Sequence, residues 1–336
     1  MRQLAWALVA LAVGLVAIST IALFLGSADV SPAAVIATVL GRSSPEAVER
    51  VVVLGLRLPR IAVAALAGGA LAVAGASLQA LTRNPLAEPA VLGVSGGAAF
   101  GVVAGQLFGL GLGMIEALGL TAFGFAGAFV AGGAVYLIAS RAGGPPAHSL
   151  LLAGVIVGIF FSSAITVLIS IVDVDRLGGV IHWLLGSVAP VSPGPLAVFA
   201  SLAAAGLALA VSQARPLNLL ALGEEAARQL GVRAEAVRWR IFVAAALLTA
   251  AVVAFVGPIG FVGLVVPHLL RLALGADNRV VIPTAFVGGA LFLLVADTVA
   301  RNLVAPAELA VGVITSFCGA PFFVYLLWTR GSRFEA

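Results

Sequence analysis

The chain has 336 residues, of which 62% are hydrophobic and 10% are charged, and its formal net charge at pH 7 is +4. A mean hydropathy of +1.19 and repeated apolar runs of about 20 residues, each long enough to cross the hydrocarbon core of a bilayer, exclude a soluble globular protein. The runs are also unbroken, whereas a membrane β-barrel has short segments of alternating hydrophobicity. The composition therefore predicts an all-α polytopic membrane protein.

Hydropathy along the chain predicts about ten transmembrane helices in a single domain that covers residues 1–336. The first apolar run, behind Arg2, has the basic start of a signal peptide. It exceeds the usual apolar core of about 7 to 15 residues and lacks a clear cleavage site, so we interpret it as an uncleaved span. The eighth run is short and interrupted by Gly and Pro, which favours a half-span buried among other helices. The predicted spans are residues 4–25, 60–81, 93–109, 115–138, 149–171, 194–211, 239–257, 260–274, 281–300 and 309–328.

The chain contains no lysine, because all 18 of its basic residues are arginine. A P-loop needs a lysine to reach the β- and γ-phosphates, so ATP hydrolysis by that route is excluded. The one cysteine, Cys318, and three scattered histidines give neither a disulfide framework nor a recognisable zinc cluster. We therefore expect no catalytic residue, no bound metal and no cofactor on this chain, and we infer no binding to nucleic acid.

The arginines also predict the orientation in the membrane. If the first span begins in the cytoplasm, ten spans return the C-terminus to the cytoplasm, and most arginines then obey the positive-inside rule. The inner segments carry Arg2, Arg83, Arg141, Arg215, Arg228, Arg233, Arg238, Arg240, Arg271, Arg279, Arg330 and Arg333. The outer segments carry Arg42, Arg50, Arg57, Arg60, Arg176 and Arg301. Three of these, Arg57, Arg60 and Arg301, lie at outer ends of spans, where charged partners outside the membrane would explain them.

The longest predicted inner segment, residues 212–238, contains "LNLLALGEEAARQLGVRAEAVR". Charged residues alternate there with apolar ones at helical spacing, and Gly231 is a natural helix stop, which predicts a short amphipathic helix under the membrane. The apolar positions are Leu217, Leu220, Leu222, Ala226 and Leu230, and the interleaved charges are Glu224, Glu225 and Arg228. A solvated loop or a helix resting on lipid headgroups is the alternative. Two adjacent acids suit an anionic leaflet poorly, which favours a protein partner.

Four motifs together resemble one known family. They are "LRLPRIAVAALAGGALAVAGASLQALTRNPLAEPAVLGVSGGAAFG" (56–101), "LGEEAARQLGV" (222–232), "GPIGFVGLVVPHLLRLALGADNR" (257–279) and "ELAVGVITSFCGAPFFVYLL" (308–327). In this order they resemble the FecCD-type permeases, the membrane subunits of ABC importers for iron-siderophores, haem and cobalamin. The resemblance runs from the first span to the last and implies the type II ABC importer permease fold.

The resemblance also implies partners and roles. A permease of this kind lies in membrane lipid of the bacterial or archaeal cytoplasmic membrane, as a homodimer or close heterodimer. Its partners are two ABC ATPase subunits, which bind ATP and Mg, and a periplasmic or lipoprotein substrate-binding protein. The segment that matches the ATPase-coupling element contains Leu222, Gly223, Glu224, Glu225, Arg228 and Gly231. Positions that match the binding-protein docking arginines are Arg57, Arg60 and Arg301. The positions that match the cytoplasmic gate lie in "TRNPLAEP" (82–89) and are Asn84, Pro85 and Leu86, for which a structural turn is the alternative.

The segment "VDVDRLGGVIHWLLGS" (172–187) resembles the outer gating helix of the family. Arg176 or His182 would meet an anionic chelate there, but Asp173 and Asp175 neutralise much of that field. Among the chelates, an iron-siderophore is the commonest assignment for such a permease, with haem and cobalamin as alternatives. An apolar pathway suits a large chelate that is passed on without being held.

Two other classes of protein remain as alternatives. "GVSGG" (93–97) fits the short serine motifs of intramembrane and α/β hydrolases, with Ser95 as nucleophile and His148, His182 or His268 as base. A nucleophile elbow needs a strand before the serine, whereas Ser95 begins a predicted helix. An ion-coupled secondary transporter needs ionisable residues in mid-membrane. The acids nearest to spans all fall close to predicted span ends, and they are Glu116, Asp297 and Glu308.

Overall fold

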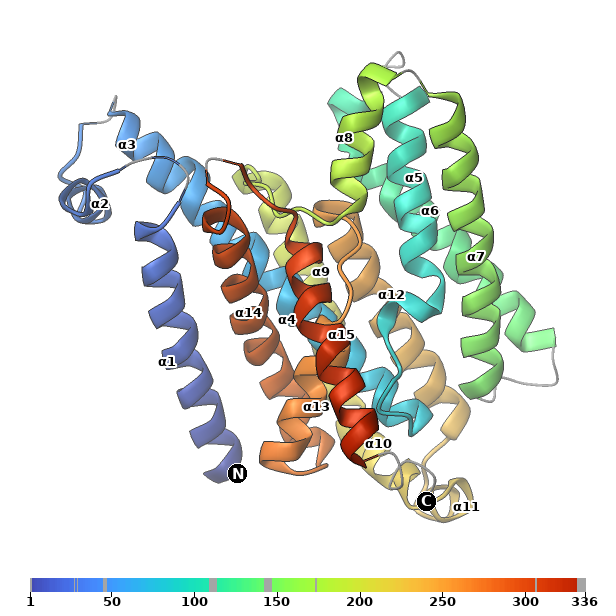
Figure 1. Ribbon diagram of the computed structural model, residues 1–336. Coiled ribbons are helices and arrows are strands. Elements are labelled where there is room, and N and C mark those ends of the chain that lie inside the picture. The colour runs from blue at the N-terminus through green and yellow to red at the C-terminus, as the bar shows by residue number, and fades with distance from the viewer. Residues whose placement is uncertain are drawn as a thin grey trace.

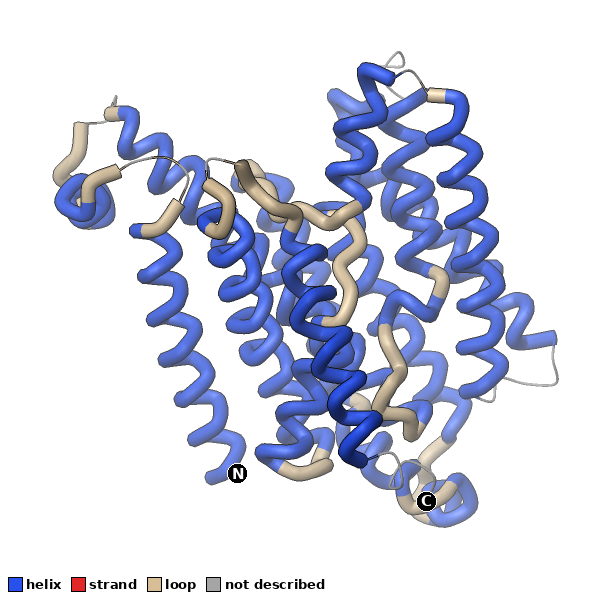
Figure 2. The backbone as a smooth tube through the Cα atoms, in the orientation of Figure 1, coloured by secondary structure: helices blue, strands red, loops and turns tan. Residues whose placement is uncertain are grey.

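The computed structural model describes residues 2–26, 28, 30–44, 47–108, 114–141, 147–172, 174–305 and 307–330. These residues form helices joined by turns and short irregular segments, and an isolated bridge between Val304 and Ala307 is the nearest approach to strand pairing among them (Figures 1 and 2). The all-α prediction is therefore confirmed for the described part of the chain.

The helices match the predicted spans closely. Among the described residues, seven helices are long and apolar enough to cross a bilayer. Three shorter apolar helices lie where the third, eighth and tenth spans were predicted. The seven long ones are α1 (Arg2–Phe24), η1–α4 (Val51–Arg57 and Leu58–Thr82), α6 (Met114–Arg141), α7 (Ala147–Ile171), α9 (Pro193–Ser212), α12 (Ala234–Val256) and α14 (Asn278–Asn302). The three shorter ones are α5 (Val94–Phe108), α13 (Val262–Leu274) and α15 (Val311–Arg330).

The remaining helices cap the two ends of the molecule. At the end where α1 begins and α15 ends lie α10 (Ala214–Ala221) and α11 (Glu224–Gln229), whereas α2 (Pro32–Val39), α3 (Val48–Arg50) and α8 (Val174–Leu184) lie at or toward the opposite end (Figure 1). A single turn of 3₁₀ helix, η2 (Pro89–Leu92), precedes α5. Below, the end that carries α10 and α11 is called the inner end and the opposite end the outer end.

Helix α4 is the centre of the fold and is buried along most of its length, between α14, α12, α13 and α9. It is built from Ala, Gly, Val and Leu, and its glycines lie where neighbouring backbones come closest. A Cβ atom at Gly68 would overlap the carbonyl oxygen of Gly289, and one at Gly75 would overlap that of Gly263. Small residues at such crossings allow the close van der Waals packing that holds helices together in lipid.

Replacing Gly75 with alanine should therefore destabilise the protein by about 1–3 kcal/mol, because α13 must move to admit the methyl group. Gly133→Ala on α6 is the matched control, since a Cβ there meets no atom within 4 Å beyond its chain neighbours and the backbone of its own helix. Alanine in a helix interior is about 0.5–1 kcal/mol better than glycine, so the control should be neutral or stabilising. Thermal unfolding midpoints in detergent measure both variants, and equal midpoints would contradict the close packing of α4 on α13.

A break separates α12 from α13, as the Gly- and Pro-rich sequence predicts. Helix α12 ends at Val256, Gly257 has φ of 77°, and α13 starts at Val262 after an irregular segment. Phe261 caps α13 with φ of 69°, a left-handed conformation that is uncommon for an aromatic residue. The eighth predicted span is thus a short helix of 13 residues that is buried among α4, α14 and α15, as expected for a half-span.

Candidate functional site

The segment of residues 212–238, below called the coupling segment, contains two short helices where one was predicted. Gly223, with φ of 116°, separates α10 from α11, and α11 ends at Gln229 before Gly231, which has φ of 81°. The helix stop at Gly231 is confirmed, but the predicted apolar face is only partly right. Of the predicted apolar positions, Leu217 and Leu220 are buried and Ala226 is half-buried, whereas Leu222 and Leu230 are exposed. The turn at Gly223 changes the direction of the chain, so one helical period does not run through both helices.

The charged residues of α11 are mostly displayed at the surface. Glu225 and Arg228 are both 71% exposed, with 3.8 Å between the carboxylate and the guanidinium. Glu224 pairs with Arg238 at 2.5 Å and so ties the start of α11 to the first turns of α12. Two adjacent acids at the start of α11 suit an anionic lipid surface poorly, so this surface and the exposed Leu222 favour contact with another protein.

Hydrogen bonds connect α10 to the transmembrane helices through a set of polar residues, below called the amide network. Asn218 of α10 donates to Asp277 at 2.6 Å and accepts from the backbone and side-chain nitrogens of Asn278 at 2.9 and 2.8 Å. Arg271 of α13 donates to the side chain of Asn278 at 3.0 Å and to the carbonyl oxygen of Ala76 on α4 at 3.1 Å. The amide network thus links α10 directly to the start of α14 and, through Arg271, to α13 and α4.

Asp277 is the N-cap of α14, and its carboxylate accepts hydrogen bonds from Arg279 and Asn218. The bond from Arg279 is the main cause that lowers the pKa of Asp277 from 3.8 to about 2. A lowered pKa in the folded state means that the stabilising contribution is present above the unfolded value and is lost as the pH falls from about 4 toward 2. The carboxylate that orients Asn218 therefore stays ionised throughout the physiological range.

The three residues that match the cytoplasmic gate of the family lie in the irregular loop between α4 and η2. The side-chain oxygen of Asn84 accepts a hydrogen bond from the backbone nitrogen of Leu86 at 2.9 Å, which closes a tight turn around Pro85. The side chain of Leu86 is exposed, and the neighbouring Arg83 donates to the carbonyl oxygen of Leu220 in the coupling segment. The loop for which the resemblance predicts a gate role is thus joined to α10.

Glu88 is a residue of this loop that the sequence did not single out. Its carboxylate accepts a hydrogen bond from the backbone nitrogen of Phe261 at 2.6 Å, and so holds the loop against the break before α13. On the same side, the amide of Gln79 donates to the carbonyl oxygen of Gly263 at 3.1 Å. Two of the sequence motifs, "TRNPLAEP" and "GPIGF", therefore meet in space.

Two adjoining cavities of about 640 and 370 Å³ extend from this region toward the outer end. Both are lined by Ala90, Ser95, Leu184 and Pro258, and they lie between α5, α7, α8 and α15. A helix, α8, is present within the segment 172–187, for which the resemblance predicts a gating role, and the backbone nitrogen of Ser187 in the turn after it donates to the carbonyl oxygen of Val256 at 2.9 Å. Of its polar residues, His182 is exposed, whereas Asp173 and the side chains of Asp175 and Arg176 lie outside the described residues.

The three outer arginines are placed at the outer ends of α4 and α14, but they point into the protein. Arg60 pairs with Asp297 at 3.0 Å and with Glu308 at 2.7 Å, and Arg301 lies 3.2 Å from Asp297. Asp297 is fully buried and Arg301 is 3% exposed. Arg57, 4% exposed, donates to the carbonyl oxygens of Leu23, Phe24 and Ala28.

Neither alternative class of protein finds support in the described residues. The 3₁₀ turn η2 and Gly93 precede Ser95, where a nucleophile elbow needs a strand. His268 packs against the rings of Phe322 and Phe323, and the side chain of His148 lies outside the described residues. Asp297 lies near the outer end of α14, between two arginines, which does not suit an ion carrier in mid-membrane. The side chain of Glu116 also lies outside the described residues.

Comparison with known proteins agrees with this geometry. The haemin transport system permease HmuU of Yersinia pestis is 40% identical over 318 residues, which cover 94% of this chain and 95% of HmuU. The vitamin B12 import system permease BtuC of Vibrio parahaemolyticus is 40% identical over 324 residues, which cover 95% and 93%. A solved structure described as an inward-facing, metal-chelate type ABC transporter superposes with a TM-score of 0.83 at 32% identity and covers 96% of this chain and 98% of its own.

The family model of the FecCD transport family matches residues 14–329, which is nearly the whole chain. The family match, the ten apolar helices of the described chain and the superposition all agree on one architecture. The chain therefore belongs to the FecCD transport family and is an integral permease subunit of an ABC importer for metal chelates in the cytoplasmic membrane.

Proposed function

We propose that this permease is driven through the coupling segment by two separate ATPase subunits, which bind and hydrolyse ATP with Mg. The observation that carries the proposal is the continuous set of hydrogen bonds from Asn218 to α14, α13 and α4, together with the bond from Arg83 to Leu220. Closure of the ATPases on α11 would move α10, and the same bonds would move the gate loop. The termini and the coupling segment then face the cytoplasm.

Glu225→Arg should weaken association with the ATPase by roughly tenfold at low salt, because the variant reverses a charge at the edge of the proposed contact. The loss should shrink as salt is raised, since exposed charges are screened over about 10 Å at 0.1 M. Glu49→Arg, an exposed acid at the outer end, is the matched control. Binding of purified ATPase to the detergent-solubilised permease measures both, and equal losses would place the ATPase elsewhere.

On the outer end, the proposed partner is a substrate-binding protein. Arg60 and Glu308 are the accessible members of the ion-pair cluster, whereas Arg57 and Arg301 lie beneath the surface and would shape the docking site from below. Exposed ion pairs contribute only about 0–1 kcal/mol each, so they would orient the partner more than hold it. Direct contact of Arg57 or Arg301 with the partner would require their present hydrogen bonds to open.

The cargo that we propose is a ferric siderophore, passed through a pathway between two copies of the permease. The names of HmuU and BtuC give haemin and vitamin B12 as the molecules that these relatives transport, so the substrate class of this permease is a preformed chelate. The cavities beside α5 and α7 present small apolar side chains and the hydroxyls of Ser95, Ser162, Ser163 and Thr166, which offer contact surface more than metal ligands. Choice among chelates would then rest with the binding protein.

Reconstituted vesicles test this function. The permease, its ATPase and its binding protein are incorporated together, and uptake of a ferric siderophore, haem and cobalamin is followed with and without ATP. We expect uptake of the ferric siderophore that requires both ATP and the binding protein. Uptake of haem or cobalamin in its place would overturn the choice of cargo, and uptake without ATP would overturn the proposed coupling.

A further inference from the structure

A groove on the side of the molecule formed by α6 and α12 opens beside α11, and the last residues of the coupling segment, Arg233 to Arg238, line its open end. Two adjoining cavities of about 310 and 470 Å³ share Tyr136, Trp239 and Phe242. The larger one is a slot between α5, α6 and α12, and its lining side chains are apolar except at Tyr136 and Trp239. The smaller one opens at the inner end, beside the first turns of α12.

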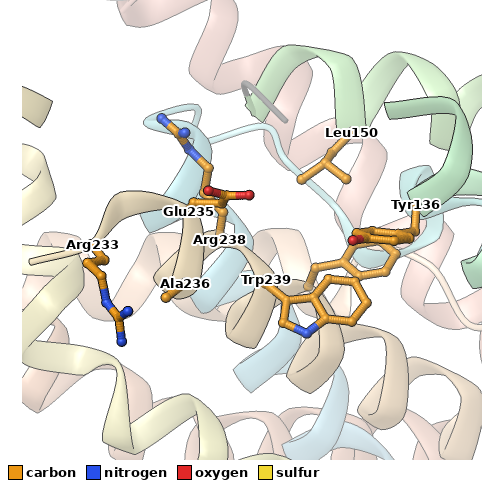
Figure 3. Close-up of a pocket in the computed structure, with 8 residues that line it drawn as sticks. Tyr136, Leu150, Arg233, Glu235, Ala236, Arg238 and Trp239 are labelled. Atoms are coloured by element: carbon orange, nitrogen blue, oxygen red, sulfur yellow. The ribbon is translucent and has the colours of Figure 1, made fainter. Parts of the chain in front are cut away.

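The open end of the groove, below called the mouth, is charged (Figure 3). Arg233, Glu235 and Arg238 line it, and Glu235 and Arg238 lie next to each other near Trp239. Arg238 is neutralised by Glu224 of the coupling segment. Among the residues that the structure describes, Arg233 and Glu235 have no ion-pair partner. The mouth therefore offers one uncompensated cation and one uncompensated anion.

The aromatic residues place the groove relative to the membrane. The rings of Tyr136 and Trp239 are tilted at 52° to each other with 4.6 Å between their centroids, and Trp239 stacks on Phe242 at 5.8 Å. Tyr136 lies near the inner end of the span Gly119–Arg141, and Trp239 near the inner end of the span Ala234–Val256. Because Tyr and Trp prefer the membrane–water interface, the mouth lies at the level of the headgroups and the slot at the level of the acyl chains.

We propose that this groove binds a phospholipid of the inner leaflet whose headgroup carries a phosphate and a primary amine, as phosphatidylethanolamine does. An acyl chain fills the slot, because an apolar slot at this depth has no water to fill it. The guanidinium of Arg233 binds the phosphate, and the carboxylate of Glu235 accepts hydrogen bonds from the ammonium. The opposite charges at the mouth complement a zwitterionic headgroup better than a purely anionic one.

Lipid retention measured by native mass spectrometry tests the proposal. The full-length protein is purified in detergent and mixed with phosphatidylethanolamine, phosphatidylcholine or phosphatidylglycerol of equal chain length. Retention of phosphatidylethanolamine should need about tenfold less lipid than retention of the other two lipids. A tenfold difference in affinity is what one additional charge-assisted hydrogen bond, from the ammonium to Glu235, is expected to supply. Glu235→Gln should abolish that preference and leave retention of phosphatidylglycerol unchanged or higher.

Trp239→Ala removes the ring shared by slot and mouth and should reduce retention of all three lipids, whereas Trp239→Phe should preserve most of it. Trp6→Ala is the matched control, since Trp6 is a 73% exposed indole near the start of α1, at the same end of the molecule. The headgroup assignment would be overturned if the unmodified protein retained the three lipids equally and Glu235→Gln did not change their retention. Unchanged retention in Trp239→Ala, or an equal loss in Trp6→Ala, would overturn the site itself.

Discussion

Replacing Asp297 with asparagine should lower the free energy of unfolding by about 3–5 kcal/mol, the cost of removing one partner from a buried ion pair. Asp297 is fully buried and is the common partner of Arg60 and Arg301. Asparagine has nearly the same size but no charge, so both guanidinium groups lose their shared counter-ion. Arg301 is affected most, because two of its side-chain nitrogens are buried and find no hydrogen-bond acceptor among the described residues.

Thermal and denaturant unfolding in detergent measures this effect, with Glu308→Gln as the matched control. Glu308 also pairs with Arg60, but it is 35% exposed, so water replaces the lost interaction and the cost should stay within about 0–1 kcal/mol. A shift in Asp297→Asn as small as that in the control would show that the cluster is hydrated and that its charges do not depend on one another.

The membrane spans could be predicted from the sequence because hydropathy and length alone determine them. The chain has ten apolar runs, and the described structure has an apolar helix at each, including the short α13 that the Gly- and Pro-rich segment 257–260 predicted. The packing of α4 is less visible in the sequence. Its glycines suggest close contacts, but which helix approaches Gly68 and which approaches Gly75 depends on the tertiary arrangement.

The candidate site was only partly predictable, because its contacts join segments that are far apart in the chain. Glu88 and Phe261 are 173 positions apart, and nothing local shows that the carboxylate would hold the break before α13. The outer arginines were recognised by position, but their burial follows from Asp297 and from the carbonyl oxygens at the end of α1. In the coupling segment, one positive φ angle at Gly223 altered the apolar face that simple helical spacing predicts.

Asn218→Ala should reduce the amount of chelate imported per ATP hydrolysed by roughly tenfold, which corresponds to about 1.4 kcal/mol of lost coupling free energy. The variant removes the three hydrogen bonds that join α10 to the start of α14. Each such bond contributes about 1 kcal/mol net, so the loss of these bonds is enough to let α10 move without α14. ATPase docking should be unchanged, because α11 and the pair between Glu224 and Arg238 remain intact.

The measurement is uptake and ATP hydrolysis in the same reconstituted vesicles, so that their ratio is independent of the amount of protein. Gln3→Ala is the matched control, since the amide of Gln3 also joins two helices at the inner end by donating to the carbonyl oxygen of Leu274, but it does not contact α10. An unchanged ratio in Asn218→Ala, or an equal fall in Gln3→Ala, would contradict transmission through the amide network. A fall confined to Asn218→Ala, with hydrolysis maintained, is the expected result, because only this variant separates the coupling segment from the helices that it must move.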